Sequence, residues 1–179
     1  MNGPVFLTGF MATGKTKVGR LLARRMGRRF IDTDDMVEER AGMTVAGIFS
    51  QKGESWFRDL EHACLVEVAS RGDVVVALGG GAITQARNRD AIRESPGLLI
   101  CLQADLDTIL ERVSRKETRP LLAGLNTEQK RKKIEDMLAE RAPFYASANM
   151  TVRSSGERTP EETAEEIHRS LERRPPCRR

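Results

Sequence analysis

Aromatic residues are scarce in this chain of 179 residues, which has six phenylalanines, one tyrosine and one tryptophan. A core built from this composition must be mainly aliphatic, and there is little aromatic surface on which the bases of a single-stranded nucleic acid could stack. The three cysteines and two histidines are few and scattered. Their number and spacing exclude a disulfide framework and argue against a metal site built from histidine or cysteine.

Long hydrophobic runs are also missing. No apolar run approaches the roughly 20 residues that a membrane-spanning helix needs. The first four residues, Met-Asn-Gly-Pro, are not a basic segment followed by a hydrophobic one, so no secretory signal is expected. We therefore expect a cytoplasmic protein with no membrane partner.

The formal net charge of +4 at pH 7 raises the question of a nucleic-acid partner. The basic stretches are residues 24–29, 130–133 and 173–179. A helix end favours cations, a solvated helix face carries mixed charges, and a Pro-rich basic tail is typical of disorder, so each stretch has a simpler explanation. We expect no nucleic-acid partner, a disordered tail over residues 174–179, and an enzyme whose two substrates are both anions.

Residues 9–16 read Gly-Phe-Met-Ala-Thr-Gly-Lys-Thr, which matches the phosphate-binding pattern G-x-x-x-x-G-K-[ST]. Gly9 and Gly14 allow backbone angles that a side chain would forbid, so that the loop can turn its N–H groups towards a polyphosphate. Lys15 is expected to reach the outer phosphates, and the Thr16 hydroxyl is placed to bind Mg²⁺. A glycine-rich turn with no ligand is the alternative. The candidate nucleotide-binding residues here are Gly9, Ala12, Thr13, Gly14, Lys15, Thr16 and Lys17.

Short apolar runs alternate with helical patterns along the whole chain. Expected strands cover residues 5–8, 30–32, 74–78, 98–102 and 150–153. Expected helices cover residues 15–26, 34–41, 44–51, 55–70, 85–93, 105–115, 127–141 and 160–173. The runs at 74–78 and 98–102 are apolar without alternation, as in parallel strands covered on both faces. The order predicts one α/β domain over residues 1–173, with a central five-stranded parallel sheet between two layers of helices. Asp105 and Thr159 are expected helix N-caps, and Gly27 is expected to end the first helix.

Two segments interrupt this regular order. Residues 116–126 contain Pro120 and Gly124 and show little periodicity, so they form either a plain connector or a mobile lid over the nucleotide, about residues 114–126. Gly79, Gly80 and Gly81 directly follow a buried strand. A strand-to-helix turn needs only one glycine, so three of them indicate that the backbone approaches something closely.

Two aspartates follow the second expected strand, at the sheet edge where the phosphate loop lies. Asp32 and Asp34 alternate along the chain and can share a face, whereas Thr33 points away. One carboxylate could hold Mg²⁺ and the other could accept a hydroxyl proton. The alternative is that Asp34 or Asp35 caps the following helix.

Three arginines are candidates for binding a second anion. Arg58 has Glu54 four residues before it and Glu61 three after it, and on a helix both carboxylates can hold its guanidinium in one rotamer. Such an arginine can bind a carboxylate through two hydrogen bonds, although a surface ion-pair network would look the same in sequence. Arg119 lies in the irregular segment, and Arg141 is expected at the end of a helix.

Taken together, these pieces resemble the shikimate kinase family, and the resemblance runs over roughly residues 5–170. The matching segments are residues 9–16, 30–34, 48–54, 57–61, 78–82, 119–121 and 140–145. The resemblance implies a P-loop kinase fold, usually a monomer. It also implies transfer of the γ-phosphoryl group of ATP, assisted by Mg²⁺, to the 3-hydroxyl of shikimate, a step towards chorismate and the aromatic amino acids.

The resemblance also implies roles for individual residues. The loop amides and Lys15 bind the ATP phosphates, and Thr16 and Asp32 hold Mg²⁺. Asp34 faces the reacting hydroxyl as a possible base, while Arg58 and Arg141 clamp the carboxylate of the acceptor. The remaining expected contacts are Gly79, Gly80 and Gly81 with the acceptor, Arg119 with the transferred group, and Arg112 and Arg153 near adenine.

The chain departs from the family pattern at two positions. Ala12 stands where the family commonly has glycine, and alanine fits this loop only if the position avoids positive φ. Lys17 stands where a second hydroxyl residue is common, so Thr16 serves the metal alone and Lys17 points outward. Two other functions stay open at this point. One is a kinase of the same fold for gluconate or a nucleoside monophosphate, and the other is a nucleotide-binding protein without catalysis.

Overall fold

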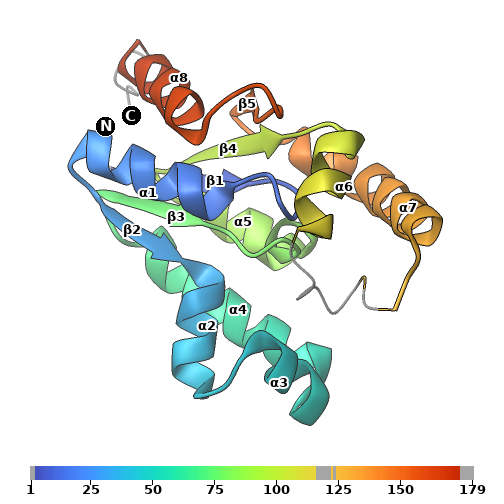
Figure 1. Cartoon of the computed structure of the whole chain (residues 1–179). Helices are drawn as coiled ribbons and strands as arrows, with labels where there is room; N and C mark the ends of the chain where they lie inside the picture. Colours follow the sequence, from blue (N-terminus) through green and yellow to red (C-terminus); the bar gives the residue numbers. More distant parts are fainter. Residues whose placement is uncertain (1–2, 116–121, 123, 174–179) are drawn as a thin grey trace.

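A five-stranded parallel sheet forms the centre of the computed structural model, which describes residues 3–115, 122 and 124–173. Its strands are β1 (Val5–Thr8), β2 (Arg29–Asp32), β3 (Val74–Ala77), β4 (Leu98–Gln103) and β5 (Met150–Arg153). They lie in the order β2-β3-β1-β4-β5 (Figure 1). The apolar residues of β1 and β3 are buried on both faces, as the sequence predicted for β3.

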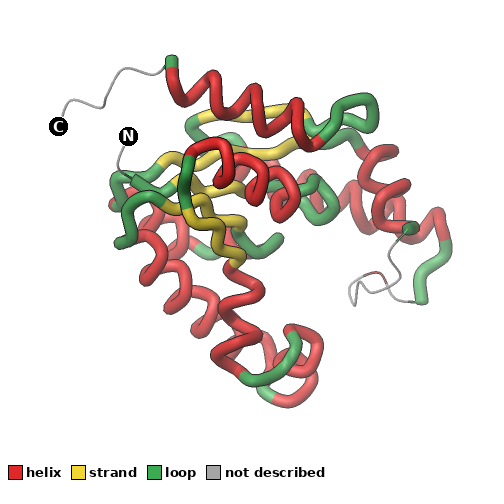
Figure 2. The backbone as a smooth tube through the Cα atoms, turned by 60° about the vertical axis from the view of Figure 1, so that its left-hand side comes forward, coloured by secondary structure: helices red, strands yellow, loops and turns green. Residues whose placement is uncertain are grey.

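Helices cover both faces of this sheet (Figure 2). They are α1 (Lys15–Met26), α2 (Thr33–Ala41), α3 (Val45–Gln51), α4 (Gly53–Ala69), α5 (Ala86–Glu94), α6 (Leu106–Ser114), α7 (Thr127–Tyr145) and α8 (Pro160–Glu172), with a 3₁₀ turn η1 (Ala82–Thr84). On one face α1 and α8 enclose a core of aliphatic side chains such as Leu22, Ile100 and Ile167. On the other face α4 and α5 cover Phe6, Val76 and Leu99. Within the described residues, no helix combines the length and the apolar character that a membrane crossing requires.

A helical arm extends beyond the sheet from the end of β2. Figure 1 shows α2, α3 and the first half of α4 projecting from the carboxyl edge. The arm has its own small core, in which Val37, Ile48, Phe57 and Cys64 are buried. It carries Asp34 and Arg58, so its attachment decides where these two side chains lie.

Capping explains where several helices begin. Asp105 and Thr159 accept backbone N–H groups at the starts of α6 and α8, as expected from the sequence, and Gly27 ends α1 in the left-handed conformation. Asp32 caps α2 by accepting the N–H of Asp34. The cap of this helix is therefore neither Asp34 nor Asp35, the two residues considered for that role.

Helix α7 is longer than the sequence predicted. It continues past Arg141 to Tyr145 and contains Pro143, so the expectation that Arg141 ends the helix was wrong. A proline disfavours helix at the preceding residue and cannot donate to the carbonyl four residues earlier. Here that carbonyl belongs to Ala139, which is exposed, whereas Phe144 and Tyr145 pack against the core beneath α7. Burial of these two rings outweighs the local cost of the proline.

The strand register brings three loops to one edge. Ala77 of β3 pairs with Leu7 of β1 on one side and with Asp32 of β2 on the other. The segments that follow these three strands therefore begin at nearly the same height, with the β3 segment between the other two. Ligands of parallel sheets bind at this edge, beyond the carboxyl ends of the strands.

Candidate active site

The phosphate loop has the backbone geometry that its sequence predicted. Gly9 and Gly14 have φ values of 141° and 90°, and a Cβ at Gly9 would collide with the carbonyl oxygen of Leu102. The Nζ of Lys15 donates to the carbonyl oxygens of Gly9 at 2.8 Å and Phe10 at 3.1 Å. The ammonium group thus lies over the loop, next to the N-terminus of α1, where an anion is favoured.

Ala12 does adopt positive φ, so the condition under which alanine fits this position without strain is not met. Its φ is 63°, in the left-handed region that costs a residue with a Cβ about 1–2 kcal/mol. Its carbonyl oxygen accepts a hydrogen bond of 3.1 Å from Nη1 of Arg112, a residue of α6. This contact from a distant helix stabilises a loop conformation that alanine alone would disfavour, and the sequence around Ala12 carries no sign of it.

Replacing Ala12 by glycine is expected to stabilise the fold slightly. Relief of about 1–2 kcal/mol of backbone strain exceeds the 0.4–1 kcal/mol lost to the greater freedom of glycine in the unfolded chain, which leaves a gain of roughly 0.5 kcal/mol. Urea denaturation measures the free energy of unfolding. Ala139→Gly, at an exposed position inside α7, is the matched control and should destabilise. A loss of stability in Ala12→Gly would contradict the strain.

Thr16 and Asp32 form an oxygen pair beside the loop. The Thr16 hydroxyl donates to Oδ2 of Asp32 at 2.8 Å, and Oδ1 of the same carboxylate accepts the N–H of Asp34. Burial raises the pKa of Asp32 above its ordinary value, against the opposing effect of the Thr16 hydrogen bond. A hydroxyl and a desolvated carboxylate are donors that suit Mg²⁺, which takes few protein ligands besides water and phosphate. No cluster of three or more histidine, cysteine or acidic ligands occurs in the part of the chain that the structure describes.

The turn at Gly79–Gly81 lies against the acidic and basic side chains of the helical arm. A Cβ at Gly79 would collide with Oδ1 of Asp34 and would come within 2.9 Å of Oε1 of Glu61. A Cβ at Gly81 would come within 2.8 Å of Nη2 of Arg58. Gly80 has no such neighbour. Two of the three glycines are therefore needed for close approach, as the sequence suggested, and what they approach is Asp34 and Arg58.

Arg58 is held as its spacing predicted. It forms ion pairs with Glu61 at 2.9 Å and with Glu54 at 3.2 Å, and its guanidinium also lies over the Phe57 ring. Glu61 is only 1% exposed, and its Oε1 has no hydrogen-bond partner among the described residues. Burial raises the pKa of Glu61 against the lowering effect of Arg58. Such a buried carboxylate keeps the guanidinium in one orientation towards the glycine turn.

Arg141, on α7, reaches the same turn. Its Nη1 donates to the carbonyl oxygen of Gly80 at 2.8 Å, and its guanidinium lies 5.6 Å from the centre of the Phe10 ring in the phosphate loop. Arg58 on α4 and Arg141 on α7 therefore meet adjacent residues of one turn. That turn is one strand away from the phosphate loop.

Arg112 joins the phosphate loop to the segment after β5. Besides the carbonyl of Ala12, it donates to the hydroxyl of Ser154 at 3.2 Å and to the carbonyl of Ser155 at 3.3 Å. Ser154 is buried and its hydroxyl lies near Gly14. Nothing in the sequence distinguishes Ser154, because one serine after a strand carries no functional signal. The neighbouring Arg153 is exposed at the end of β5.

Some of the remaining candidate site residues lie in the part of the chain that the structure describes, and others lie outside it. Lys17 is exposed, as expected. Thr13 is buried and its hydroxyl donates to the carbonyl of Phe10 at 2.8 Å. Arg119, most of the expected lid and the tail 174–179 lie outside the described residues. Leu122 is described and packs in a cluster with Phe10 and Ile134.

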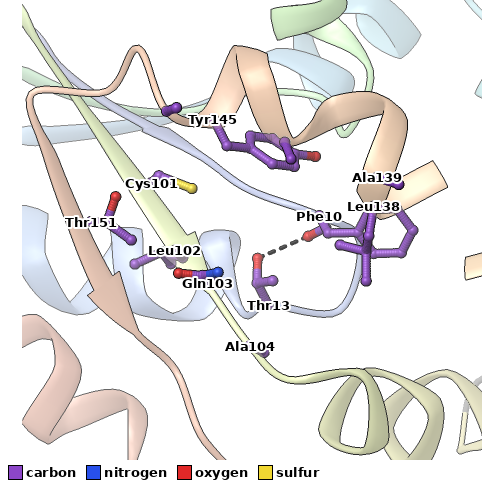
Figure 3. A pocket seen from close by; sticks show the side chains of 12 residues that line it. Phe10, Thr13, Cys101, Leu102, Gln103, Ala104, Leu138, Ala139, Tyr145 and Thr151 are labelled. Carbon is purple, nitrogen blue, oxygen red and sulfur yellow. Dashed lines mark hydrogen bonds between the residues drawn. The ribbon is translucent and has the colours of Figure 1, made fainter. Parts of the chain in front are cut away.

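A cavity of about 490 Å³ lies beside the phosphate loop (Figure 3). It is formed by the loop residues Phe10 and Thr13, by the end of β4 and by one side of α7. Neither Asp34, Arg58 nor Arg141 lines it. Figure 3 shows Cys101 of β4 and Tyr145 of α7 on its walls. Burial raises the pKa of the Cys101 thiol to about 11.

Cys101 is expected to resist alkylation in the native protein. A thiol with a pKa of about 11 has a thiolate fraction at pH 8 roughly 200-fold below that of an ordinary cysteine. Iodoacetamide labelling, with mass spectrometry of the peptides, should show slow modification that accelerates tenfold from pH 8 to pH 9. The denatured chain serves as the control and should react at the ordinary rate. Equal rates in both states at pH 8 would contradict the shift.

Comparison with known proteins decides the family. A family model for shikimate kinase matches residues 11–172. The chain belongs to the shikimate kinase family. A shikimate kinase from Caldanaerobacter subterraneus subsp. tengcongensis is 43% identical over 166 residues, which cover 93% of this chain and 94% of that protein.

Solved shikimate kinases have the same fold. The structure of the Bacteroides thetaiotaomicron enzyme is similar with a TM-score of 0.89 and 34% identity, covering 96% of this chain and 99% of that one. The Acinetobacter baumannii enzyme, solved in complex with shikimate, is similar with a TM-score of 0.87 and 36% identity, covering 94% and 92%. The fold expected from the sequence, a parallel sheet between helices with the phosphate loop of the P-loop kinases, is confirmed.

Proposed function

We propose that this chain transfers the γ-phosphoryl group of ATP to the 3-hydroxyl of shikimate, giving shikimate 3-phosphate on the route to chorismate and the aromatic amino acids. The observation that carries the proposal is the convergence of Asp34, Arg58 and Arg141 on the Gly79–Gly81 turn, one strand from the phosphate loop. A carboxylate beside two guanidinium groups suits an acceptor that has both hydroxyl groups and a carboxylate. The two anionic substrates then lie side by side at one sheet edge.

On the nucleotide side, the loop amides of residues 9–16 and the ammonium of Lys15 bind the ATP phosphates. Lys15 exchanges its contacts with the carbonyls of Gly9 and Phe10 for the phosphate oxygens. Arg112 supports the loop at Ala12 and lies on the adenine side, with Arg153 at the same edge. Phosphoryl transfer needs mainly positioning and charge stabilisation, which these groups supply.

Thr16 and Asp32 are the residues that would hold Mg²⁺. A bound ion would supply positive charge that offsets the charge of the ATP phosphates. Asp32 also caps α2 through the N–H of Asp34, so the carboxylate has a fixed orientation before any ion arrives.

On the acceptor side, Arg58 and Arg141 clamp the carboxylate, and Asp34 orients the reacting hydroxyl and accepts its proton. The backbone of Gly79, Gly80 and Gly81 lies against the ring hydroxyls. Arg119, from a lid over about residues 114–126, stabilises the transferred group. We further propose that residues 1–173 act as one domain, with the helices over about residues 34–61 binding the acceptor, and that the protein works as a cytoplasmic monomer.

A panel of acceptors tests the proposed function. Coupled assays measure ADP release with Mg·ATP and, in turn, shikimate, gluconate and a nucleoside monophosphate. We expect turnover with shikimate that exceeds the other two by at least 100-fold in kcat/KM, since a site built to bind a group rejects analogues that leave its buried charges unpaired. Strong turnover with gluconate and none with shikimate would overturn the proposal, and no turnover with any acceptor would favour nucleotide binding without catalysis.

A further inference from the structure

Thr33 is a buried polar residue between the two aspartates of the site. It is 1% exposed, and its side chain bonds to the backbone of β3 and of the turn that follows β3. Its hydroxyl donates to the carbonyl of Ala77 at 3.3 Å and accepts the N–H of Gly79 at 2.9 Å. A hydroxyl with both functions satisfied and no path to solvent does not contact either substrate, so its contribution must act through Gly79.

The sheet itself leaves the Gly79 N–H in need of a partner. The last pair between β2 and β3 is Asp32 with Ala77, after which β2 turns into α2 and the ladder ends. Gly79 lies just beyond this end and is buried, so water cannot take the place of the missing strand. The Thr33 side chain takes over the role that the backbone of a longer β2 would have had.

Gly79 begins the turn on which the acceptor groups converge. Oδ1 of Asp34 and Oε1 of Glu61 lie against Gly79 itself. The carbonyl oxygen of Gly80 accepts a hydrogen bond from Arg141, and Gly81 lies against Arg58. The far end of the turn is held separately, since Nδ2 of the buried Asn88 donates to the carbonyl of Ala82 at 2.9 Å. Thr33 is thus the anchor of the near end.

We propose that Thr33 is a positioning residue for the phosphate acceptor, whose hydroxyl fixes Gly79 and through it the placement of the acceptor-binding groups. The proposal rests on the acceptor site assigned above. Loss of the hydroxyl leaves a buried N–H unsatisfied, and the turn shifts to find a partner. The phosphate loop is held by other hydrogen bonds. Lys15 donates to the carbonyls of Gly9 and Phe10, and Thr16 donates to Asp32, so we expect the nucleotide side to keep its geometry.

Thr33→Val tests this, because valine keeps the volume and removes the hydroxyl. We expect the KM for shikimate and its calorimetric Kd to rise at least fivefold, with a smaller fall in kcat and a KM for ATP within twofold of the parent. Thr33→Ser restores the hydroxyl and should bring the shikimate constants back to within twofold.

Thr163→Val is the matched control. Thr163 is a fully buried threonine of α8 whose hydroxyl donates to the carbonyl of Thr159 at 3.0 Å, far from the acceptor groups in the fold. It should lower the melting temperature without changing either KM. If Thr33→Val also lowers only the melting temperature, or raises both KM values equally, the positioning role is overturned.

The double variant Arg58→Ala/Glu61→Gln separates this proposal from the site on which it rests. If the double variant weakens shikimate binding and Thr33→Val does not, the positioning role fails and the site stands. If the double variant leaves the Kd for shikimate unchanged, the acceptor site itself is misassigned and both proposals fail.

Discussion

Lys15→Ala is expected to lower kcat by at least about 100-fold, the loss typical when one preorganised group that stabilises developing charge is removed. Lys15 already lies over the loop, where its Nζ donates to the carbonyls of Gly9 and Phe10, so a change of hydrogen-bond partners is enough to bring its charge to the outer phosphates. The Kd for shikimate, measured by calorimetry in the absence of nucleotide, should stay within about twofold because Arg58 and Arg141, which are expected to hold the acceptor carboxylate, meet the Gly80–Gly81 turn after β3, one strand from the phosphate loop.

Lys132→Ala is the matched control for this experiment. It removes a lysine of α7 whose side chain is exposed and which belongs to neither proposed subsite. Its kcat should equal that of the parent, which separates loss of a specific ammonium from a general fall in positive charge. A Lys15→Ala enzyme with near-normal kcat would show that the loop does not hold the reacting phosphates.

Removing Arg58 is expected to weaken acceptor binding by roughly 10- to 100-fold, the value of one or two hydrogen bonds to a charged group, with little effect on ATP. The single variant has a second effect. It leaves the carboxylate of Glu61, only 1% exposed, without its cation, and an unpaired buried charge destabilises a fold strongly.

The structure therefore favours Arg58→Ala/Glu61→Gln as the test, since glutamine fills the same space without the charge. We expect normal folding by thermal melting, a raised KM for shikimate and an unchanged KM for ATP. Arg71→Ala, which breaks the surface pair of Arg71 with Glu67 just beyond the same helix, is the matched control and should change neither KM. An equal loss of ATP affinity in the double variant would contradict the division into two subsites.

Helix periodicity and backbone chemistry predicted much of the fold, because these signals are local. The bounds of α1 and β5 match the expectation, and Asp105 and Thr159 cap the helices that follow them. The end of α7 was misplaced because Pro143 gives a strong local stop signal. Burial of Phe144 and Tyr145 opposes that signal, and burial is a property of the assembled molecule.

The sequence also indicated which kinds of side chain form the site. A spacing of four and three residues identified the carboxylates that hold Arg58, and the run of glycines indicated a close approach. Neither pattern predicts which side chain lies against which glycine. That Gly79 accommodates Asp34 and Gly81 accommodates Arg58 depends on how the α2–α4 arm joins the sheet.

By itself, then, the order of residues determined an α/β kinase-like chain with a phosphate loop, the positions of most strands and helices, and the list of charged groups available for two anions. These follow from interactions between residues a few positions apart. Only the tertiary structure decided that Arg112 holds Ala12 in a left-handed conformation, that Thr33 anchors Gly79, and that Arg58 and Arg141 meet one turn. Each of these contacts joins segments that are distant along the chain, and no local pattern encodes which distant group will satisfy a given backbone atom.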